Sequence, residues 1–225
     1  MNKAPDTALI IGDSGGIGAA LAAALSERGT AVTGLSRRRD GLDMTCETSV
    51  ADHLAGLAAP FDLVIVATGA LTIDGAGPEK TIRAISARAM ADQFALNAIG
   101  PALVLREAHR LLPRRRPSVF AVLSARVGSI GDNRLGGWVS YRAAKAAVNQ
   151  VVQTAAIELA RSHRQAACVA LHPGTVATPF TADYLGRHPA VPPATAAGNL
   201  LGVIARLTPA QSGAFLDWQG KEIPW

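Results

Sequence analysis

A tyrosine and a lysine that stand four residues apart, Tyr141 and Lys145, are the side chains whose types and spacing most clearly suggest chemistry. Residues at this spacing share one face of a helix. A phenol has a pKa near ~10, and a nearby ammonium group favours the phenolate and lowers that pKa. Such a pair can exchange a proton with an alcohol or a carbonyl oxygen. Taken alone, the spacing also fits a tyrosine at the edge of the core and a solvated lysine.

A glycine-rich turn near the N-terminus suggests a ligand for this pair. The apolar run 8–11 has the length of a buried parallel strand, and residues 17–28 have helical spacing. Glycines let the backbone approach a pyrophosphate, which rests on the N-terminus of the following helix. The sequence therefore indicates a dinucleotide site, with a plain glycine-rich turn as the alternative. Its residues are Gly12, Asp13, Ser14, Gly15, Gly16, Ile17 and Gly18.

Apolar runs and helical stretches alternate along the chain. We expect strands at 8–11, 31–35, 63–67, 118–123, 167–171 and 213–216, and helices at 17–28, 50–58, 86–98 continuing to 112, 139–162 and 193–206. This alternation is typical of an α/β fold with a Rossmann-type, doubly wound parallel sheet between two layers of helices. It predicts a single domain over residues 1–225. The proline-rich stretch 178–193 is expected to be a loop, either an ordinary surface connection or a cover over the substrate.

The residues after the second expected strand bear on the choice of dinucleotide. Ser36, Arg37 and Arg38 stand where an acidic residue would bind the ribose 2′-hydroxyl of NAD. Cations suit the 2′-phosphate of NADP instead. The sequence therefore predicts NADP(H) in preference to NAD(H), with arginines that are merely exposed as the alternative.

Composition excludes several other classes of protein. The chain has 225 residues, of which 49% are hydrophobic and 17% charged, which suits a sizeable core. It has no apolar run of the ~18 residues that a membrane span needs. Residues 1–6 are polar and lead directly into the first expected strand, so we expect no signal peptide. The two cysteines form no metal or disulfide pattern. The net charge of +5 is spread over short clusters, without a nucleic-acid-binding motif. We therefore expect a cytoplasmic protein with no metal, membrane or nucleic-acid partner.

Together, the glycine turn and the Tyr141–Lys145 pair resemble the short-chain dehydrogenase/reductase family, which combines a TGxxxGxG turn with a YxxxK helix. Ile11 stands here in place of the usual threonine. Residues 128–133, 136–138 and 213–218 are similar to the C-factor-like or sniffer-like subgroup, and the resemblance covers nearly the whole chain. It implies hydride transfer between NADP(H) and a small carbonyl or alcohol substrate by a homodimer or homotetramer. Tyr141 would be the acid–base group, and Lys145 would lower its pKa and hold the nicotinamide ribose.

The resemblance also assigns roles to residues elsewhere in the chain. Asn97 would bind water in a proton relay that reaches Lys145, the alternative being an asparagine satisfied by local backbone. Contacts with the adenine are implied for Asp43 and Met44. Contacts with the cofactor ribose are implied for Ala67, Thr68 and Gly69, a segment that lacks the family's asparagines. The family's PG-x-V-x-T segment, which closes over the nicotinamide, corresponds to Pro173, Gly174, Val176 and Thr178.

One position departs from the family pattern. The family's strand ends in Ser-Ser-x-x-Gly, and the second serine is catalytic; aligned on Gly128, that position is Ala125 here. Either Ser124 or Ser129 supplies the hydroxyl, or the hydroxyl is missing and turnover is weaker. The alternative function is a dinucleotide-binding sensor or interaction protein with little turnover. The sequence does not specify the substrate: Trp138, Val139, Phe180 and Tyr184 fit an apolar pocket or ordinary packing equally well.

Overall fold

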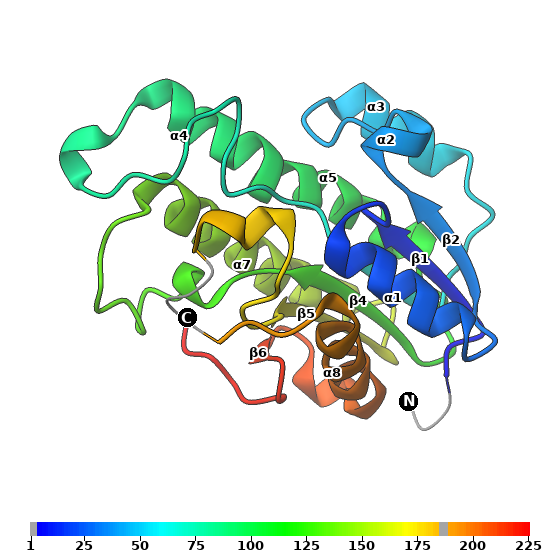
Figure 1. Cartoon of the computed structure of the whole chain (residues 1–225). Helices are drawn as coiled ribbons and strands as arrows, with labels where there is room; N and C mark the ends of the chain where they lie inside the picture. The colour runs from blue at the N-terminus through cyan, green and yellow to red at the C-terminus, as the bar shows by residue number, and fades with distance from the viewer. Residues whose placement is uncertain (1–3, 185–188) are drawn as a thin grey trace.

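A parallel sheet runs through the middle of the protein (Figure 1). The computed structural model describes residues 4–184 and 189–225, and within them the sheet has six strands in the order β2-β1-β3-β4-β5-β6. Because β1 pairs with β2 on one side and β3 on the other, the strand order reverses at β1, the place where such sheets bind ligands. The strands are β1 (Thr7–Ile11), β2 (Ala31–Leu35), β3 (Leu63–Val66), β4 (Ser118–Leu123), β5 (Ala166–His172) and β6 (Phe215–Asp217).

Helices cover both faces of the sheet, which confirms the expected doubly wound α/β fold (Figure 1). The α-helices are α1 (Gly16–Ser26), α2 (Arg37–Asp40), α3 (Glu47–Ala55), α4 (Ala87–Phe94), α5 (Gly100–Arg106), α6 (Ala108–Leu111), α7 (Val139–Leu159) and α8 (Pro193–Arg206). A π-helical stretch, η2 (Ala95–Ile99), joins α4 to α5. Short 3₁₀ helices occur at η1 (Ile82–Ala84), η3 (Arg126–Gly128), η4 (Pro179–Tyr184) and η5 (Pro209–Gln211).

Three local features differ from the sequence expectation. The helix expected from 86 to 112 is divided, because Pro101 has no N–H to donate to the carbonyl of Asn97 and the backbone widens to a π-helix before it. The short helix α2 was not expected; Asp40 stabilises it by accepting a hydrogen bond from the Ser36 N–H at 2.7 Å. The expected strand at 213–216 begins only at Phe215, since Gly213 has a φ of 94° that does not continue a strand.

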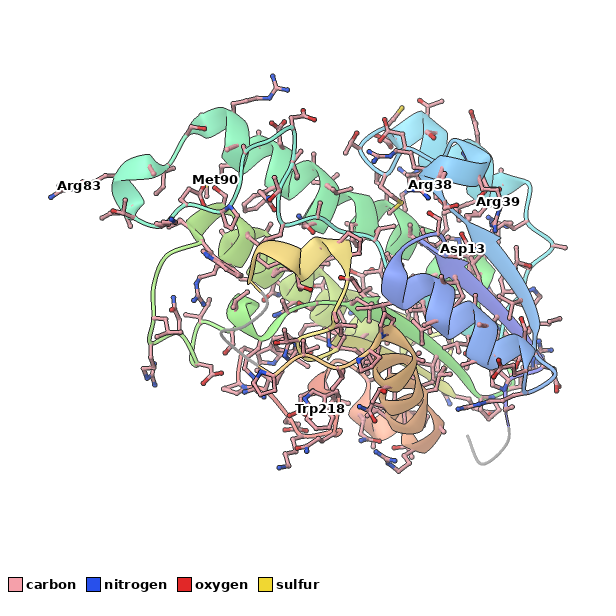
Figure 2. The ribbon with its side chains drawn as sticks, in the orientation of Figure 1. Asp13, Arg38, Arg39, Arg83, Met90 and Trp218 are labelled. Atoms are coloured by element: carbon pink, nitrogen blue, oxygen red, sulfur yellow. The ribbon has the colours of Figure 1, made fainter. Side chains whose placement is uncertain are left out.

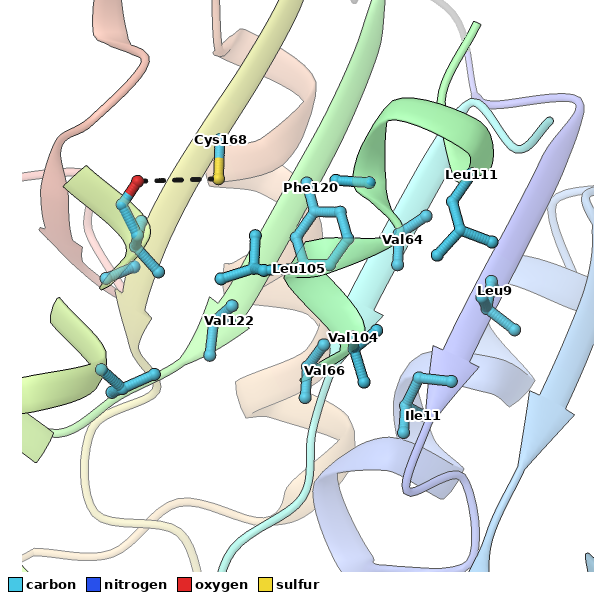
Figure 3. Packing of buried hydrophobic residues seen from close by; sticks show 14 of the residues in the cluster. Leu9, Ile11, Val64, Val66, Val104, Leu105, Leu111, Phe120, Val122 and Cys168 are labelled. Atoms are coloured by element: carbon cyan, nitrogen blue, oxygen red, sulfur yellow. Dashed lines mark hydrogen bonds between the residues drawn. The ribbon is translucent and has the colours of Figure 1, made fainter. Parts of the chain in front are cut away.

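The core lies on both sides of the sheet. Alternate strand residues face opposite sides, so Leu9 and Ile11 join one cluster while Ala8 and Ile10 join the other. The first cluster packs against α5 and α7, and the second against α1 and α8. Figure 3 shows part of the first cluster, with Phe120 of β4 among leucines and valines of the neighbouring strands and helices. Strands buried on both faces explain their continuous apolar runs.

The stretch 178–193, expected as a loop, contains η4, and residues 185–188 lie outside the described residues. Backbone hydrogen bonds fasten its two ends together, from Ala177 N–H to Val191 O at 2.9 Å and from Val191 N–H to Thr175 O at 3.0 Å. The role of a substrate cover stays a prediction. In the part of the chain that the structure describes, no helix has both the length and the hydropathy needed to cross a membrane.

Replacing Phe120 by alanine tests the packing of the sheet. Phe120 is 0% exposed, and we expect Phe120→Ala to lower the free energy of unfolding by about 3–5 kcal/mol, because it leaves a cavity between β4 and its covering helices. Ile157→Ala is the control: Ile157 is 55% exposed on α7, and its loss should change stability by about 0.5 kcal/mol or less. Chemical denaturation measures both, and equal losses would contradict the packing.

Candidate active site

The Tyr141–Lys145 pair lies in the first turns of α7, at the carboxyl end of β4. Both residues are buried, at 4% and 3% exposure. Lys145 Nζ donates a hydrogen bond to Leu123 O, at the end of β4, over 3.0 Å. The same nitrogen lies 5.8 Å from the centroid of the Tyr141 ring. The helix that the sequence predicts at this position is confirmed, and it brings the two side chains together.

Burial determines the protonation of both groups. It raises the pKa of Tyr141 well above the ordinary 10.0 and lowers that of Lys145 from 10.5 to about 8. The expectation that Lys145 lowers the tyrosine pKa is therefore wrong for this structure, where loss of water outweighs the ammonium group, whose hydrogen bond goes to Leu123 O. The consequence is a phenol that keeps its proton at neutral pH and has it to give.

Asn97 lies beside this pair, within the π-helical stretch η2. It is 0% exposed; its amide nitrogen donates to Ala70 O at 2.9 Å and to Gln93 Oε1 at 2.7 Å, and its oxygen accepts from the Ala70 N–H at 3.2 Å. A Cβ on Gly69 would lie 2.7 Å from Asn97 Oδ1 and 3.6 Å from Lys145 Nζ. The absence of a side chain at Gly69 thus lets Asn97 and Lys145 share one small space. The partners of Asn97 are the backbone of Ala70, 27 positions earlier in the sequence, and the side chain of Gln93, and its relay role stays a prediction.

Both candidate serines are buried and bonded to other groups. Ser124 donates its hydroxyl to Asn149 Oδ1, further along α7, at 2.6 Å. Ser129 donates its hydroxyl to Pro224 O and accepts a hydrogen bond from the Asp132 N–H at 3.0 Å. These contacts turn the hydroxyls toward the helix and toward the last residues of the sequence. A catalytic role for either serine stays a prediction.

The glycine turn joins β1 to α1 and meets three other segments. Gly12 has a φ of 94°, and a Cβ on Gly18 would lie only 2.1 Å from Gly12 O, so the turn requires glycine at both positions. A Cβ on Gly16 would lie 2.6 Å from the methyl group of Thr178. The segment after β5 therefore lies against the turn. On the other side, the Ala67 N–H donates to Ile11 O at 2.7 Å, which brings the end of β3 to the same edge.

The residues around this turn fit a bound dinucleotide. Asp13 Oδ1 and Thr68 Oγ1 are buried and have no hydrogen-bond partner among the described residues. Thr68 lies beside the turn, since its methyl carbon would be 3.0 Å from a Cβ on Gly12. Buried polar atoms almost always have partners, so these two are suited to hydrogen bonds from a ligand. Within the described ranges, no group of His, Cys, Asp and Glu side chains is arranged to hold a metal ion.

The remaining residues predicted to bind the cofactor near β2 differ in their exposure and in their hydrogen bonds. Arg37 and Arg38 follow β2, are exposed, and form no ion pair among the residues described, whereas Ser36 is buried. Asp43 is exposed and its carboxylate accepts hydrogen bonds from the side chain and the N–H of Thr45, which lower its pKa. Met44 is a member of the core rather than of an open surface.

The segment after β5 packs against neighbouring parts of the fold. A Cβ on Gly174 would lie 3.1 Å from the Trp218 ring, and Val176 is buried and bridges to Val191. His172 has a pKa that burial lowers to about 4, which keeps it neutral and agrees with a structural part.

Sequence reasoning missed Glu79, a buried carboxylate at the N-terminus of α7. Its Oε2 accepts a hydrogen bond from the Ser140 N–H at 3.2 Å, and its other oxygen accepts one from the Ser140 hydroxyl. Its backbone oxygen accepts one from the Trp138 N–H. Burial raises the pKa of Glu79, but the hydrogen bonds from Ser140 outweigh it, so the net pKa is lowered and the carboxylate suits the positive end of the helix. Glutamates are rarely buried, so nothing in the sequence marked this one.

Two aromatic rings flank the phenol. The Trp138 ring meets Tyr141 edge-on with centroids 6.2 Å apart, and the Phe180 ring lies 6.3 Å away on η4. Trp138 adopts a left-handed backbone conformation with a φ of 54°, directly before α7 begins. Tyr141 therefore has aromatic neighbours in addition to the nearby ammonium group of Lys145.

Comparison with known proteins identifies the family. The family described as "Enoyl-(Acyl carrier protein) reductase" matches residues 41–212, more than half of the chain. The 1-hydroxy-2-glutathionyl-2-methyl-3-butene dehydrogenase of Rhodococcus sp. (strain AD45) is 30% identical over 235 residues, which cover 97% of this chain and 99% of that protein. The chain is a short-chain dehydrogenase/reductase. It is therefore an NAD(P)-dependent oxidoreductase, and the predicted family and enzyme class are confirmed.

Other short-chain dehydrogenases/reductases share its fold. A member from Burkholderia multivorans, solved with bound NADP, has a TM-score of 0.79 at 25% identity and covers 98% of this chain and 100% of its own. The carbonyl reductase Sniffer of D. melanogaster has a TM-score of 0.77 at 20% identity, over 98% of this chain and 99% of its own, and shows the fold alone. The C-signal protein of Myxococcus xanthus is 37% identical over 139 residues, 60% of this chain and 78% of that protein.

The burial of Lys145 predicts a pH dependence of stability. Between pH 8 and 10.5 the unfolded chain keeps a proton on this lysine that the folded protein has released, so rising pH favours the folded state. We expect the free energy of unfolding of the parent, relative to a Lys145→Met variant, to increase by about 2 kcal/mol from pH 7.5 to 10. Denaturant titration measures it, and the contribution of the buried Cys168 thiol, which both proteins share, cancels in the difference. Parallel pH curves would show that the lysine is not buried as described.

Proposed function

We propose that this oxidoreductase transfers a hydride between NADP(H) and the carbonyl or alcohol group of a small molecule, with Tyr141 as the acid–base residue. The observation that carries the proposal is the juxtaposition of Tyr141, Lys145, Gly69 and Asn97 at the carboxyl edge of the sheet, the edge at which the glycine turn also lies. When bound, the dinucleotide supplies or accepts the hydride, and the chain has to orient the reactants and manage one proton.

In the direction of reduction, Tyr141 gives its phenolic proton to the substrate oxygen. Its raised pKa keeps the proton in place until a stronger base, the developing alkoxide, is presented. Lys145, with a pKa of about 8, carries a positive charge at neutral pH and stabilises the phenolate that remains. Asn97 positions water for return of the proton. In the direction of oxidation the same groups take the proton from the alcohol.

Three observations support NADP(H) and an apolar substrate. Arg37 and Arg38 are exposed beside the end of β2 without ion pairs among the described residues, and the related protein from Burkholderia multivorans was solved with NADP. The rings of Trp138 and Phe180 beside Tyr141 favour a carbonyl compound with an apolar or aromatic substituent. The proposal also includes a single domain in which the cofactor contacts Ser36, Asp43, Met44 and residues 173–178. We further propose that the protein is cytoplasmic and forms a homodimer or homotetramer.

A second function is favoured by one specific observation. The position of the family's catalytic serine is Ala125, and the neighbouring hydroxyls of Ser124 and Ser129 are bonded elsewhere. A protein that binds the dinucleotide but turns over slowly, as a sensor or an interaction protein, would tolerate this arrangement. The buried Tyr141 and Lys145 favour the enzyme, because two such polar groups are costly to bury without a use.

Replacing Tyr141 by phenylalanine tests the proposed function. The change removes only the hydroxyl, so NADPH binding, followed by fluorescence titration, should stay nearly intact. Oxidation of NADPH in the presence of an active aldehyde or ketone should slow by at least ~10²-fold, because the phenolic proton donor is lost. Turnover close to that of the parent would exclude Tyr141 as the proton donor.

Variants at the two serines test which hydroxyl meets the carbonyl oxygen. We expect Ser124→Ala to lower kcat by ~10²–10³-fold, since Ser124 follows Leu123, whose carbonyl binds Lys145. Ser129→Ala should act mainly on stability through its bond to Pro224. Ala125→Ser is the matched comparison, because it places a hydroxyl in the family's usual position. Full turnover in both the Ser124→Ala and the Ser129→Ala variants, together with a rise in the Ala125→Ser variant, would show that no native serine serves the carbonyl.

A further inference from the structure

The carboxylate of Asp13 lies against β2, a strand that has no acidic residue of its own. Asp13 follows Gly12 in the glycine turn, and the Gly12 N–H donates a hydrogen bond to Leu35 O at 2.7 Å, which fastens the turn to β2. A Cβ on Gly34, the residue before Leu35, would lie only 2.0 Å from Asp13 Oδ2. The Asp13 carboxylate, from the glycine turn after β1, therefore occupies the space that a side chain at Gly34 would fill. The fold thus places an acid beside β2, although that acid stands 21 residues before Gly34 in the sequence.

Arg39 holds this carboxylate in place. Its Nη1 forms an ion pair with Asp13 Oδ2 at 2.7 Å, and its Nη2 donates to Gly34 O at 2.6 Å. The Asp13 side chain is 7% exposed and that of Arg39 is 57% exposed. Figure 2 shows Asp13, Arg38 and Arg39 at the same end of the sheet, where α2 follows β2. The pair thus has a buried acid and a cation that remains open to solvent.

The second oxygen of Asp13 has no partner in the described part of the chain. Oδ1 is buried and accepts no hydrogen bond from the described residues. An ionised carboxylate oxygen only accepts, so a ligand that satisfies it must bring a donor. The other acids nearby are engaged: Asp40 accepts from the Ser36 N–H and pairs with Arg39, and Asp43 accepts from Thr45. Of these three acids, Asp13 is the one with a buried carboxylate oxygen that accepts no hydrogen bond from the described residues.

The ribose of a bound dinucleotide carries the matching donor. In doubly wound sheets an acid at the end of the second strand accepts a hydrogen bond from the 2′-hydroxyl of NAD, whereas a cation accommodates the 2′-phosphate of NADP. A 2′-phosphate brings only negative oxygens, and a bare carboxylate would repel it. An arginine bound to that carboxylate offsets the repulsion but is then less available to the phosphate.

We propose that Asp13 is a cofactor-specificity residue, which accepts a hydrogen bond from the ribose 2′-hydroxyl of NAD(H) and holds Arg39 back from the 2′-phosphate of NADP(H). The protein then binds both dinucleotides, and the Asp13–Arg39 pair narrows the preference for NADP(H) that Arg37 and Arg38 create. This inference rests on the proposed dinucleotide-dependent function, but it concerns the choice of cofactor rather than the reaction.

Equilibrium titration of the full chain with NADPH and with NADH tests the proposal without any substrate. The measured quantity is the ratio of the Kd for NADH to the Kd for NADPH. In Asp13→Ala this ratio should rise at least ~10-fold, because the 2′-hydroxyl loses its acceptor and Arg39 becomes free for the phosphate. In Arg39→Met it should fall at least ~10-fold, because the carboxylate is left uncompensated. Asp13→Asn keeps the shape of the side chain and should raise the ratio as well, which covers the case of an alanine variant that does not fold.

Arg83→Met is the matched control for loss of one positive charge. Arg83 is exposed on η1, at the opposite side of the molecule in Figure 2, and its loss should leave the ratio unchanged. A ratio that stays constant in both Asp13 variants, or moves toward NADH, would overturn the proposal while leaving the dehydrogenase function intact. Failure of the parent protein to bind either dinucleotide would overturn the proposed function and this inference together.

Discussion

The hydrogen bond from Lys145 to the last carbonyl of β4 is the contact on which the site depends. An ammonium group loses much hydration when it is buried, and Leu123 O is the fixed acceptor that compensates part of this cost. The bond sets the position of α7 along the sheet and so places Tyr141. Close approach is needed around it: a Cβ on Gly128 would lie 2.8 Å from the backbone of Lys145, and one on Gly69 would crowd Asn97. Glycine is therefore needed at positions 69 and 128 because larger side chains there would crowd Lys145 or its neighbour Asn97.

The sequence predicts those parts of the fold that depend on the local pattern of apolar and polar residues. Buried parallel strands give continuous apolar runs, and the amphipathic helices between them have a clear period, so the doubly wound sheet could be predicted. The glycine turn and the Tyr141–Lys145 spacing could be recognised because both are short and local. The π-helical stretch could not be predicted, although Pro101 causes it, because a proline in a helix can end, bend or widen it.

The features that the sequence pattern could not predict depend on contacts between segments that are distant in the sequence. Glu79 and Asp13 are ordinary acids in the sequence, and each acquires its meaning only where it is buried, one on the N-terminus of α7 and the other over Gly34. The expected lowering of the tyrosine pKa also failed for this reason, since helical spacing says how near two groups lie but not how much water surrounds them. The sequence shows serines on either side of Ala125, yet the partners of their hydroxyls, Asn149 and Pro224, depend on tertiary structure.

The cap of α7 by Glu79 has a consequence for the order in which the protein folds. Glu79 and Ser140 are separated by 61 residues, and the segments that surround Lys145 come from both sides of that interval. Closing so long a loop costs entropy before its contacts repay it. A growing chain presents the glycine turn early, yet it lacks the helix that carries the acid–base pair until much of the sheet has been made. The acid–base pair is therefore complete only when segments far apart in the sequence have met.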